Sequence, residues 1–211
     1  MTMLLLIAVI ALNVAIAWWN ARVVGQCWNE REFMGWWMRA VLWSALVQSV
    51  VGFSCLFAPI SLGIAVLLAQ PTPEQTTYLI KFAMSFWYVT IIFPVLGTGL
   101  IITIQSWKEF ARDRSWCNAA GAGWNTYAMA SNVYDASKSL GPALDVVMDG
   151  LSALATPSSD DDAKSAIVRL ALAAILVSLL GSVLMTAWIV KRNMGTLPLP
   201  EGFDQPRRRY A

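Results

Sequence analysis

Histidine, the side chain that most often serves as a general base near neutral pH, does not occur in the 211 residues. Its absence removes the Ser-His and Cys-His nucleophile pairs, imidazole ligation of haem and most transition-metal sites. The three cysteines lack the CxxC spacing of a zinc site and indicate no disulfide framework; they are Cys27, Cys55 and Cys117. The sequence therefore predicts a protein that is not an enzyme and that holds no metal and no cofactor.

Carboxylates are the remaining groups with catalytic potential, and they gather in two places. Asp145 and Asp149, followed by Gly150, are superficially similar to the DxxDG signature of membrane phosphatidyl-alcohol transferases, but the first spacing is one residue too long. The later DxxxD pair of that signature is also missing, so the carboxylates cannot hold metal ions jointly, and we exclude this activity. The triplet Asp160–Asp162 follows Ser159 and fits a capping box that begins a helix.

The composition indicates lipid rather than water as the main solvent of the chain. Apolar residues make up 57% and charged residues 13% of the sequence, and the mean hydropathy is +0.56. Soluble domains are usually about 45–50% apolar and about 25% charged. The net charge of +2 is too small to indicate a nucleic-acid partner.

Four apolar runs are long enough for a helix to cross a bilayer, which takes about 20 residues. They are Met3–Trp19, Ala40–Ala69, Tyr78–Ser106 and Ala166–Val190. We expect the first to be a retained span rather than a signal peptide, because no Lys or Arg precedes it. The sequence therefore predicts an all-α, polytopic membrane protein with about four transmembrane helices.

The predicted organisation has four parts. Residues 1–114 form a three-span membrane region, in which the linker 20–39 is expected to be an amphipathic helix in the interface. Residues 115–162 form an amphipathic helical segment, residues 163–192 the fourth span, and residues 193–211 a tail rich in Pro and Arg. In the third span, Pro94 with Gly97 and Gly99 predicts a hinge where the helix bends or unwinds.

The segment 115–162 carries an apolar stripe at helical spacing. Its main residues are Val133, Leu140, Leu144, Val147 and Leu151. Because Gly141-Pro142 interrupts the stripe, we expect a hairpin of two helices, near Trp124–Leu140 and Pro142–Leu154. Such a narrow stripe is typical of a helix–helix seam, so it binds either the protein's own spans or a neighbouring subunit.

Two further features predict contacts with partners. Ala174, Ser178 and Ser182 stand four residues apart in the fourth span, with Gly181 beside them, and such small residues let helices pack closely within a monomer or between subunits. Near the end of the tail, the Arg207-Arg208-Arg209 run is expected to contact anionic lipid headgroups or the acidic surface of a partner.

Polar and aromatic side chains within the apolar runs have simple interpretations. Asn13, Gln48 and Gln105 are expected to form hydrogen bonds between helices. Many of the eleven tryptophans lie beside span ends and predict an aromatic belt, whereas a sugar- or quinone-binding platform lacks a polar constellation nearby. The Lys and Arg residues favour cytoplasmic positions for the two longer connections and external termini, unless the Gly141-Pro142 segment re-enters the membrane.

The absence of a catalytic pattern decides the expected function. We expect a non-catalytic integral membrane subunit of a larger envelope assembly, such as a secretion, conjugation or phage-related machine of the bacterial inner membrane. Its partners would be the lipid bilayer and other membrane protein subunits. The alternative is a homo-oligomeric pore or holin-like channel that is gated at the predicted hinge in the third span. An embedded enzyme would need an acid–base pair that the spans lack.

Overall fold

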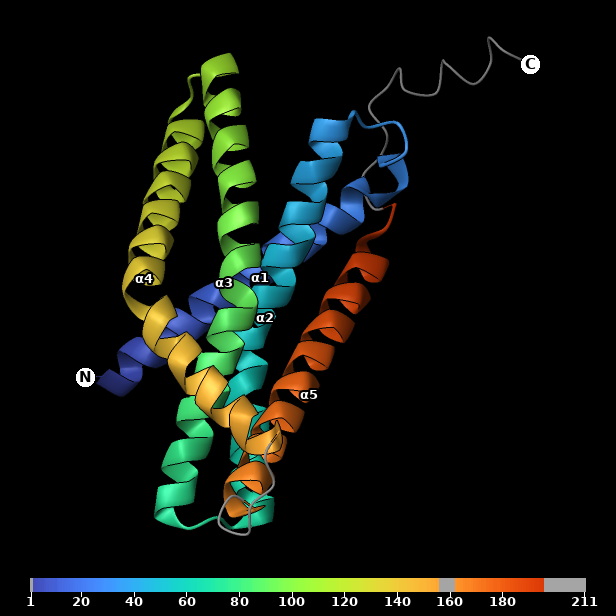
Figure 1. The fold of residues 1–211 in the computed structure, drawn as a ribbon. Helices are drawn as coiled ribbons and strands as arrows, with labels where there is room; N and C mark the ends of the chain where they lie inside the picture. The colour runs from blue at the N-terminus through green and yellow to red at the C-terminus, as the bar shows by residue number, and fades with distance from the viewer. Residues whose placement is uncertain (1, 156–161, 196–211) are drawn as a thin grey trace.

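The computed structural model describes residues 2–155 and 162–195 and consists of long helices (Figure 1). The helices are α1 (Thr2–Cys27), the short 3-10 helix η1 (Trp28–Glu30), α2 (Trp36–Ala69), α3 (Pro73–Arg112), α4 (Trp116–Ala155) and α5 (Asp162–Asn193). No strand occurs in these two ranges, which confirms the predicted all-α class.

Four helical segments are long and apolar enough to cross a membrane. They are Ile7–Glu30, Trp36–Ala69, Pro73–Arg112 and Asp162–Asn193. These segments contain the four predicted apolar runs apart from the first residues of the first, and the chain is a polytopic membrane protein. The helix α4, although it has 40 residues, is not among them.

Helices α2 and α3 form an antiparallel pair that is joined by a tight link. Gln70 closes α2 in a left-handed conformation with φ 44°, and its N–H donates to the carbonyl of Val66 at 3.0 Å. Thr72 then begins α3 through a capping box, in which its side chain accepts from the backbone N–H of Gln75 and its own N–H donates to the Gln75 amide oxygen. We call this part of the molecule the turn end.

Two apolar cores lie at the two ends of the molecule. At the turn end, the last turns of α2 pack against the first turns of α3 and α5, with Leu62, Phe82 and Val168 among the buried residues. At the opposite end, the start of α2 packs against the last turns of α1 and α5, with Leu42, Val24 and Ile189. Helix α5 therefore begins at the turn end and finishes at the opposite end, beside the start of α2.

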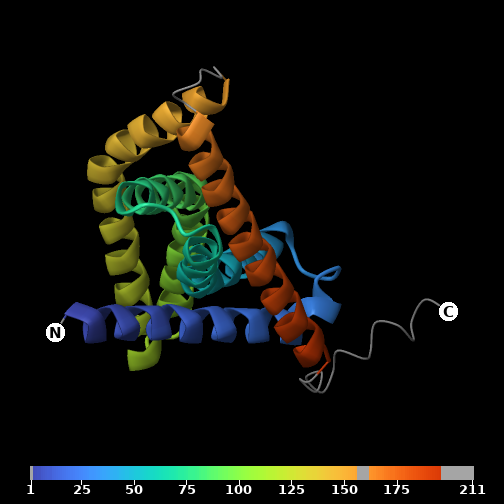
Figure 2. The same cartoon turned by 90° about the horizontal axis from the view of Figure 1, so that it is seen from below.

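Helix α1 lies across α2 and α5 rather than alongside them (Figure 2). The crossing is close: a Cβ added to Gly52 would lie 2.7 Å from Cβ of Ala17, and one added to Gly25 would meet the α5 backbone at 2.6 Å. A polar contact joins the three helices, because the Ser49 hydroxyl donates to the carbonyl of Ala17 at 2.8 Å and lies 3.3 Å from the Thr186 hydroxyl. Small residues and hydroxyl groups thus hold helices together where lipid gives no hydrophobic drive.

The predicted hairpin in segment 115–162 is wrong, because α4 is one continuous helix that contains Pro142. Figure 1 shows a clear change of direction within α4. Proline removes one backbone donor and crowds the preceding turn, and a bend relieves this crowding without ending the helix. The predicted interfacial helix over residues 20–39 is also wrong. Its first part extends α1, and η1 and a short loop lead to α2.

Of the two predicted outcomes for α3, bending or unwinding, unwinding does not occur, because the helix continues through Pro94 and Gly99 to Arg112. Figure 1 shows that α3 instead changes direction about halfway along its length. A single proline removes one hydrogen bond, and the bonds on either side keep the helix intact. The use of this bend as a hinge stays a prediction. The predicted cap at Ser159 lies outside the described residues.

Candidate functional site

Helix α4 packs on α3 through small residues. Its buried positions are Ala122, Ala136, Ala143, Val147, Gly150 and Ala153. At Gly150 the two helices are so close that an added Cβ would lie 2.2 Å from the ring of Phe82. Near the other end of α4, the Thr103 hydroxyl of α3 donates to the carbonyl of Asn125 at 3.2 Å. Residues 125–150 of α4 therefore lie beside residues 82–103 of α3.

The predicted apolar stripe is divided between the inside and the outside of the chain. Val133, Leu144 and Leu151 are 47%, 38% and 37% exposed, Leu140 is half-buried, and Val147 is buried. Part of the stripe therefore packs on the protein's own spans, and part of it stays open to a neighbour. The contact with α3 uses alanine and glycine because these residues permit close approach, which leaves the larger residues outside.

Charged residues share this outward face with the apolar ones. Asp135, Lys138 and Asp145 are exposed, and they belong to the part of α4 that lies beside the apolar run of α3. A charged side chain at the centre of a bilayer costs about 2.5–3.5 kcal/mol or more. The outward face of α4 therefore requires protein or water next to it rather than lipid.

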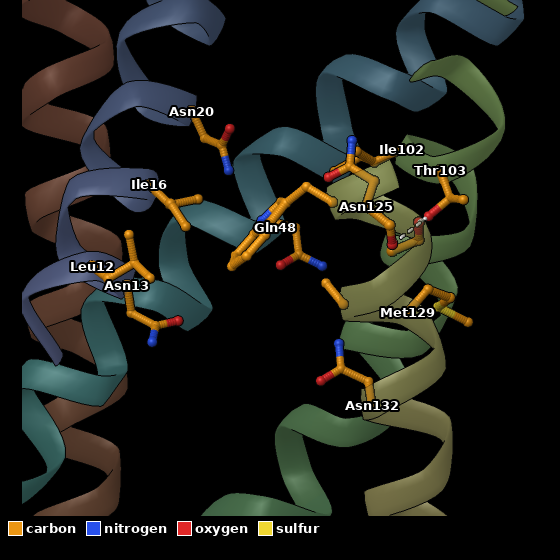
Figure 3. A pocket seen from close by; sticks show the side chains of 13 residues that line it. Leu12, Asn13, Ile16, Asn20, Gln48, Ile102, Thr103, Asn125, Met129 and Asn132 are labelled. Atoms are coloured by element: carbon orange, nitrogen blue, oxygen red, sulfur yellow. Dashed lines mark hydrogen bonds between the residues drawn. The ribbon is translucent and has the colours of Figure 1, made fainter. Parts of the chain in front are cut away.

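A cleft of about 370 Å³ lies between α1 and α4, with residues of α2 and α3 completing its lining. Figure 3 shows asparagines of α1 and α4 on its two sides and Gln48 between them. The lining residues are Leu12, Asn13, Ile16 and Asn20 of α1, Gln48 of α2, Gly99, Ile102 and Thr103 of α3, and Trp124, Asn125, Ala128, Met129 and Asn132 of α4. Five of them carry a carboxamide, and none is ionisable.

The carboxamides of this cleft are only partly used by the protein. Gln48 donates to the hydroxyl of Thr98 at 2.7 Å, and Asn13 donates to a carbonyl of its own helix at 2.9 Å. The side chains of Asn20, Asn125 and Asn132 form no hydrogen bond within residues 2–155 and 162–195. Because an unpaired polar group away from water is costly, these amides need water or a ligand as partner.

The sequence identified only part of this cleft. Asn13 and Gln48 were expected to form hydrogen bonds between helices, and Gln48 does so, whereas Asn13 bonds to its own helix. Asn20, Asn125 and Asn132 were missed. Their spacing contained a signal, because Asn20 follows Asn13 by seven residues and Asn132 follows Asn125 by seven, which places each pair on one helix face.

The predicted small-residue row of α5 lies inside the chain. Ala174, Ser178 and Ser182 are buried, and Gly181 is half-buried, with an added Cβ at 3.4 Å from the ring of Phe57 in α2. The row therefore packs within the monomer. The hydroxyl of Ser178 is buried and has no hydrogen-bond partner in the part of the chain that the structure describes.

The remaining predicted residues are dispersed. Pro94 is exposed and lines a second, entirely apolar groove between α2 and α3. A Cβ added to Gly97 would lie in open space. Gly99 lines the cleft, and a Cβ added there would lie 3.3 Å from the sulfur of Met129. The arginines at 207–209 lie outside the described residues.

The two ends of the molecule differ in charge. At the opposite end, basic residues outnumber acidic ones. The basic residues there are Arg22, Arg31, Arg39, Lys108, Arg112, Arg114, Lys191 and Arg192, and the acidic ones are Glu30, Glu32, Glu109 and Asp113. At the turn end, Lys81, Lys164 and Arg169 are balanced by Glu74, Asp149 and Asp162. Helix α4 returns the chain to the turn end, so the 115–162 segment does not begin and end on one side. This path matches the alternative in which the segment passes back, rather than the first prediction. From the positive-inside rule we therefore expect the opposite end, with the end of α5, in the cytoplasm.

An exposed contact joins three helices at the turn end. Lys164 of α5 forms an ion pair with Asp149 of α4 at 2.9 Å, and the Tyr78 hydroxyl of α3 donates to the same carboxylate at 3.3 Å. The hydrogen bond from Lys164 is the main cause that lowers the pKa of Asp149 below its ordinary value of 3.8. This contact positions the last turn of α4.

Known proteins add no further constraint on the site. Comparisons with protein-family models, with curated proteins and with solved structures found no match. Within the described ranges, no group of three His, Cys, Asp or Glu side chains is arranged to hold a metal ion. The function is therefore inferred from the cleft and from the outward face of α4.

Proposed function

We propose that this protein is a non-catalytic integral membrane subunit of a larger assembly and that the outward face of α4 binds a neighbouring subunit. The observation that supports the proposal is the placement of Asp135, Lys138 and Asp145 beside the apolar run of α3. Lipid is a poor neighbour for these charges, whereas a second membrane protein can pair them.

The mixed character of this face favours protein over bulk water as its partner. Val133, Leu144 and Leu151 are exposed on the same helix as these charged residues. An apolar stripe next to charged groups is typical of a protein–protein contact, in which an apolar core is surrounded by polar residues. We further propose the bacterial inner membrane as the location and a secretion, conjugation or phage-related machine as the assembly.

A homo-oligomeric pore is the second candidate, and one observation favours it. If copies associate through α4, its charged residues and the neighbouring carboxamide cleft would line a common water-filled path. The bend of α3 near Pro94 would then supply a gate. This candidate places a second copy, rather than a different protein, against the same face.

Affinity purification in mild detergent tests both candidates. The informative variants are Leu144→Asp and Leu151→Asp, because both residues are more than a third exposed and neither is one of the buried positions of α4. Phe33→Asp is the matched control, since it adds the same charge at an exposed apolar residue in the loop before α2.

We expect the wild type and Phe33→Asp to co-purify with different chains, and the two α4 variants to lose them while remaining inserted. A wild type that migrates as a homomer, and that the α4 variants reduce to a monomer, would support the pore instead. Retention of every partner by both α4 variants would refute the assignment of this face as the binding surface.

A further inference from the structure

We propose that the carboxamide cleft binds a neutral, hydroxyl-rich group, which is either the sugar headgroup of a glycolipid or a free saccharide. The cleft offers hydrogen-bonding groups from Asn13, Asn20, Gln48, Asn125 and Asn132. This inference concerns a different surface from the outward face of α4 and does not depend on the proposed function.

The hydrogen-bonding groups are distributed along the cleft rather than gathered at one point. The two asparagines of α1 are seven residues apart, and so are the two of α4, which corresponds to about 10 Å along each helix. Figure 3 shows one pair on each side of the cleft, with Gln48 between them. A ligand that forms hydrogen bonds with both asparagines of each pair needs polar groups along its length. The hydroxyls of a sugar ring or a disaccharide provide such groups.

The lining determines the charge of the ligand. A phosphate or carboxylate is usually held by Arg, Lys or a helix N-terminus, and an organic cation by carboxylates or an aromatic cage. None of the lining residues is ionisable. Each carboxamide both donates and accepts hydrogen bonds, as hydroxyl groups do, so a neutral ligand with several hydroxyls matches this lining.

An aromatic residue stands at the edge of the same cleft. Trp124 lines it and is 52% exposed, while Ile16, Ile102 and Met129 add apolar surface. A sugar ring presents C–H groups on its faces and hydroxyls on its edges, so a flat indole and several amides together complement it. The unpaired side chains of Asn20 and Asn125 are available for this purpose.

The position of the cleft leaves two sources for such a ligand. Gln48 belongs to the apolar run of α2, and Thr103 to that of α3. Of the four helices that line the cleft, α1, α2 and α3 are thus apolar enough to cross a membrane, and α4 is not. A glycolipid would enter from the bilayer with its headgroup in the cleft. A free saccharide would enter from the aqueous side, and the hydrogen-bonding chemistry is the same for both.

Binding is measured on the full chain in phosphatidylcholine nanodiscs, with tritium-labelled monoglucosyl diacylglycerol in one arm and tritium-labelled maltose in the other. Purification must avoid glucoside and maltoside detergents, because their headgroups would compete. The test variant Asn125→Leu with Asn132→Leu keeps the side-chain size and removes the hydrogen bonds. Asn29→Leu is the control, since Asn29 is exposed and lies outside the cleft.

We expect saturable binding in one arm and at least tenfold weaker binding by the double variant, with the Asn29→Leu control unchanged. The arm that shows binding identifies the source, and binding in both arms supports the shared chemistry. If the double variant fails to insert, Asn132→Leu alone serves as the test variant, with a smaller loss expected. Absence of saturable binding to the wild type in both arms, or equal binding by wild type and variant, overturns the proposal.

Discussion

Gly150 provides a stringent test of the packing between α3 and α4. A Cβ at this position would lie 2.2 Å and 2.4 Å from two carbons of the Phe82 ring, and this ring must move by about 1.2 Å to reach the 3.4 Å of ordinary contact. Phe82 is fully buried, and it stacks between Tyr78 and Phe86 with centroid distances of 6.5 and 6.0 Å. The ring therefore has little room to yield.

Two opposing effects set the change in the free energy of unfolding that we expect for Gly150→Ala. Overpacking of a well-filled core costs about 1–3 kcal/mol. Replacement of glycine by alanine within a helix contributes about 1 kcal/mol in the stabilising direction. We therefore expect a net loss of up to about 2 kcal/mol. Gly123→Ala, on the same helix and with open space around its Cβ, should gain up to about 1 kcal/mol.

The assay is unfolding of the purified protein in detergent, followed by circular dichroism for both alanine variants and for the wild type. A second pair of variants isolates the contact: in a Phe82→Leu background, Gly150→Ala should cost less than in the wild type, because the crowded ring is gone. Equal stability of the Gly150→Ala and Gly123→Ala proteins would refute this account of the α3–α4 contact.

Three further outcomes are expected. Ser178→Leu should lower stability by about 1–3 kcal/mol through overpacking, since Ser178 is 1% exposed, and an unchanged melting profile would contradict its burial. Asp149→Asn should lower stability at neutral pH by no more than about 1 kcal/mol, because the ion pair with Lys164 is exposed. The pKa of Asp149 is lower in the folded state than in the unfolded state. The stabilisation by the ion pair is therefore present above pH 3.8 and is lost as the pH falls through the folded pKa. If the melting temperatures of the wild type and Asp149→Asn follow the same pH profile, this explanation is refuted. An impermeant maleimide should label Cys117, an exposed residue at the opposite end, only after cells are permeabilised, and labelling of intact cells would invert the inferred orientation.

The four spans could be predicted because lipid imposes a simple rule on composition and length. The apolar runs at 40–69, 78–106 and 166–190 all lie within described helices. The boundaries of the helices are set by local groups instead, as the capping box of Thr72 and Gln75 shows. That box was present in the sequence as Thr-Pro-Glu-Gln, but the prolines around it were interpreted only as a break between helices.

The path of α4 could not be predicted from the period of its large residues. The period correctly indicates a helix, but it does not indicate which face is buried, and α4 buries Ala136, Ala143 and Gly150 rather than Leu144 and Leu151. The energetic reason is that close backbone approach, not side-chain volume, drives packing between helices in lipid. The first topology prediction failed because a helix with this composition was not expected to run beside a full span, whereas the alternative in which the 115–162 segment passes back matches the path of α4.

The composition of α4 follows from its three different neighbours. Alanine and glycine face α3, asparagines and Trp124 face the cleft beside α1, and charged residues mixed with Leu144 and Leu151 face outward. Such a helix is too polar for lipid, so we propose a partner on the outward face and water or a ligand in the cleft. Because the outward face and the cleft use different residues, a change such as Leu151→Asp should weaken assembly while leaving saccharide binding intact. Asn132→Leu should do the reverse, so the two proposals can fail separately.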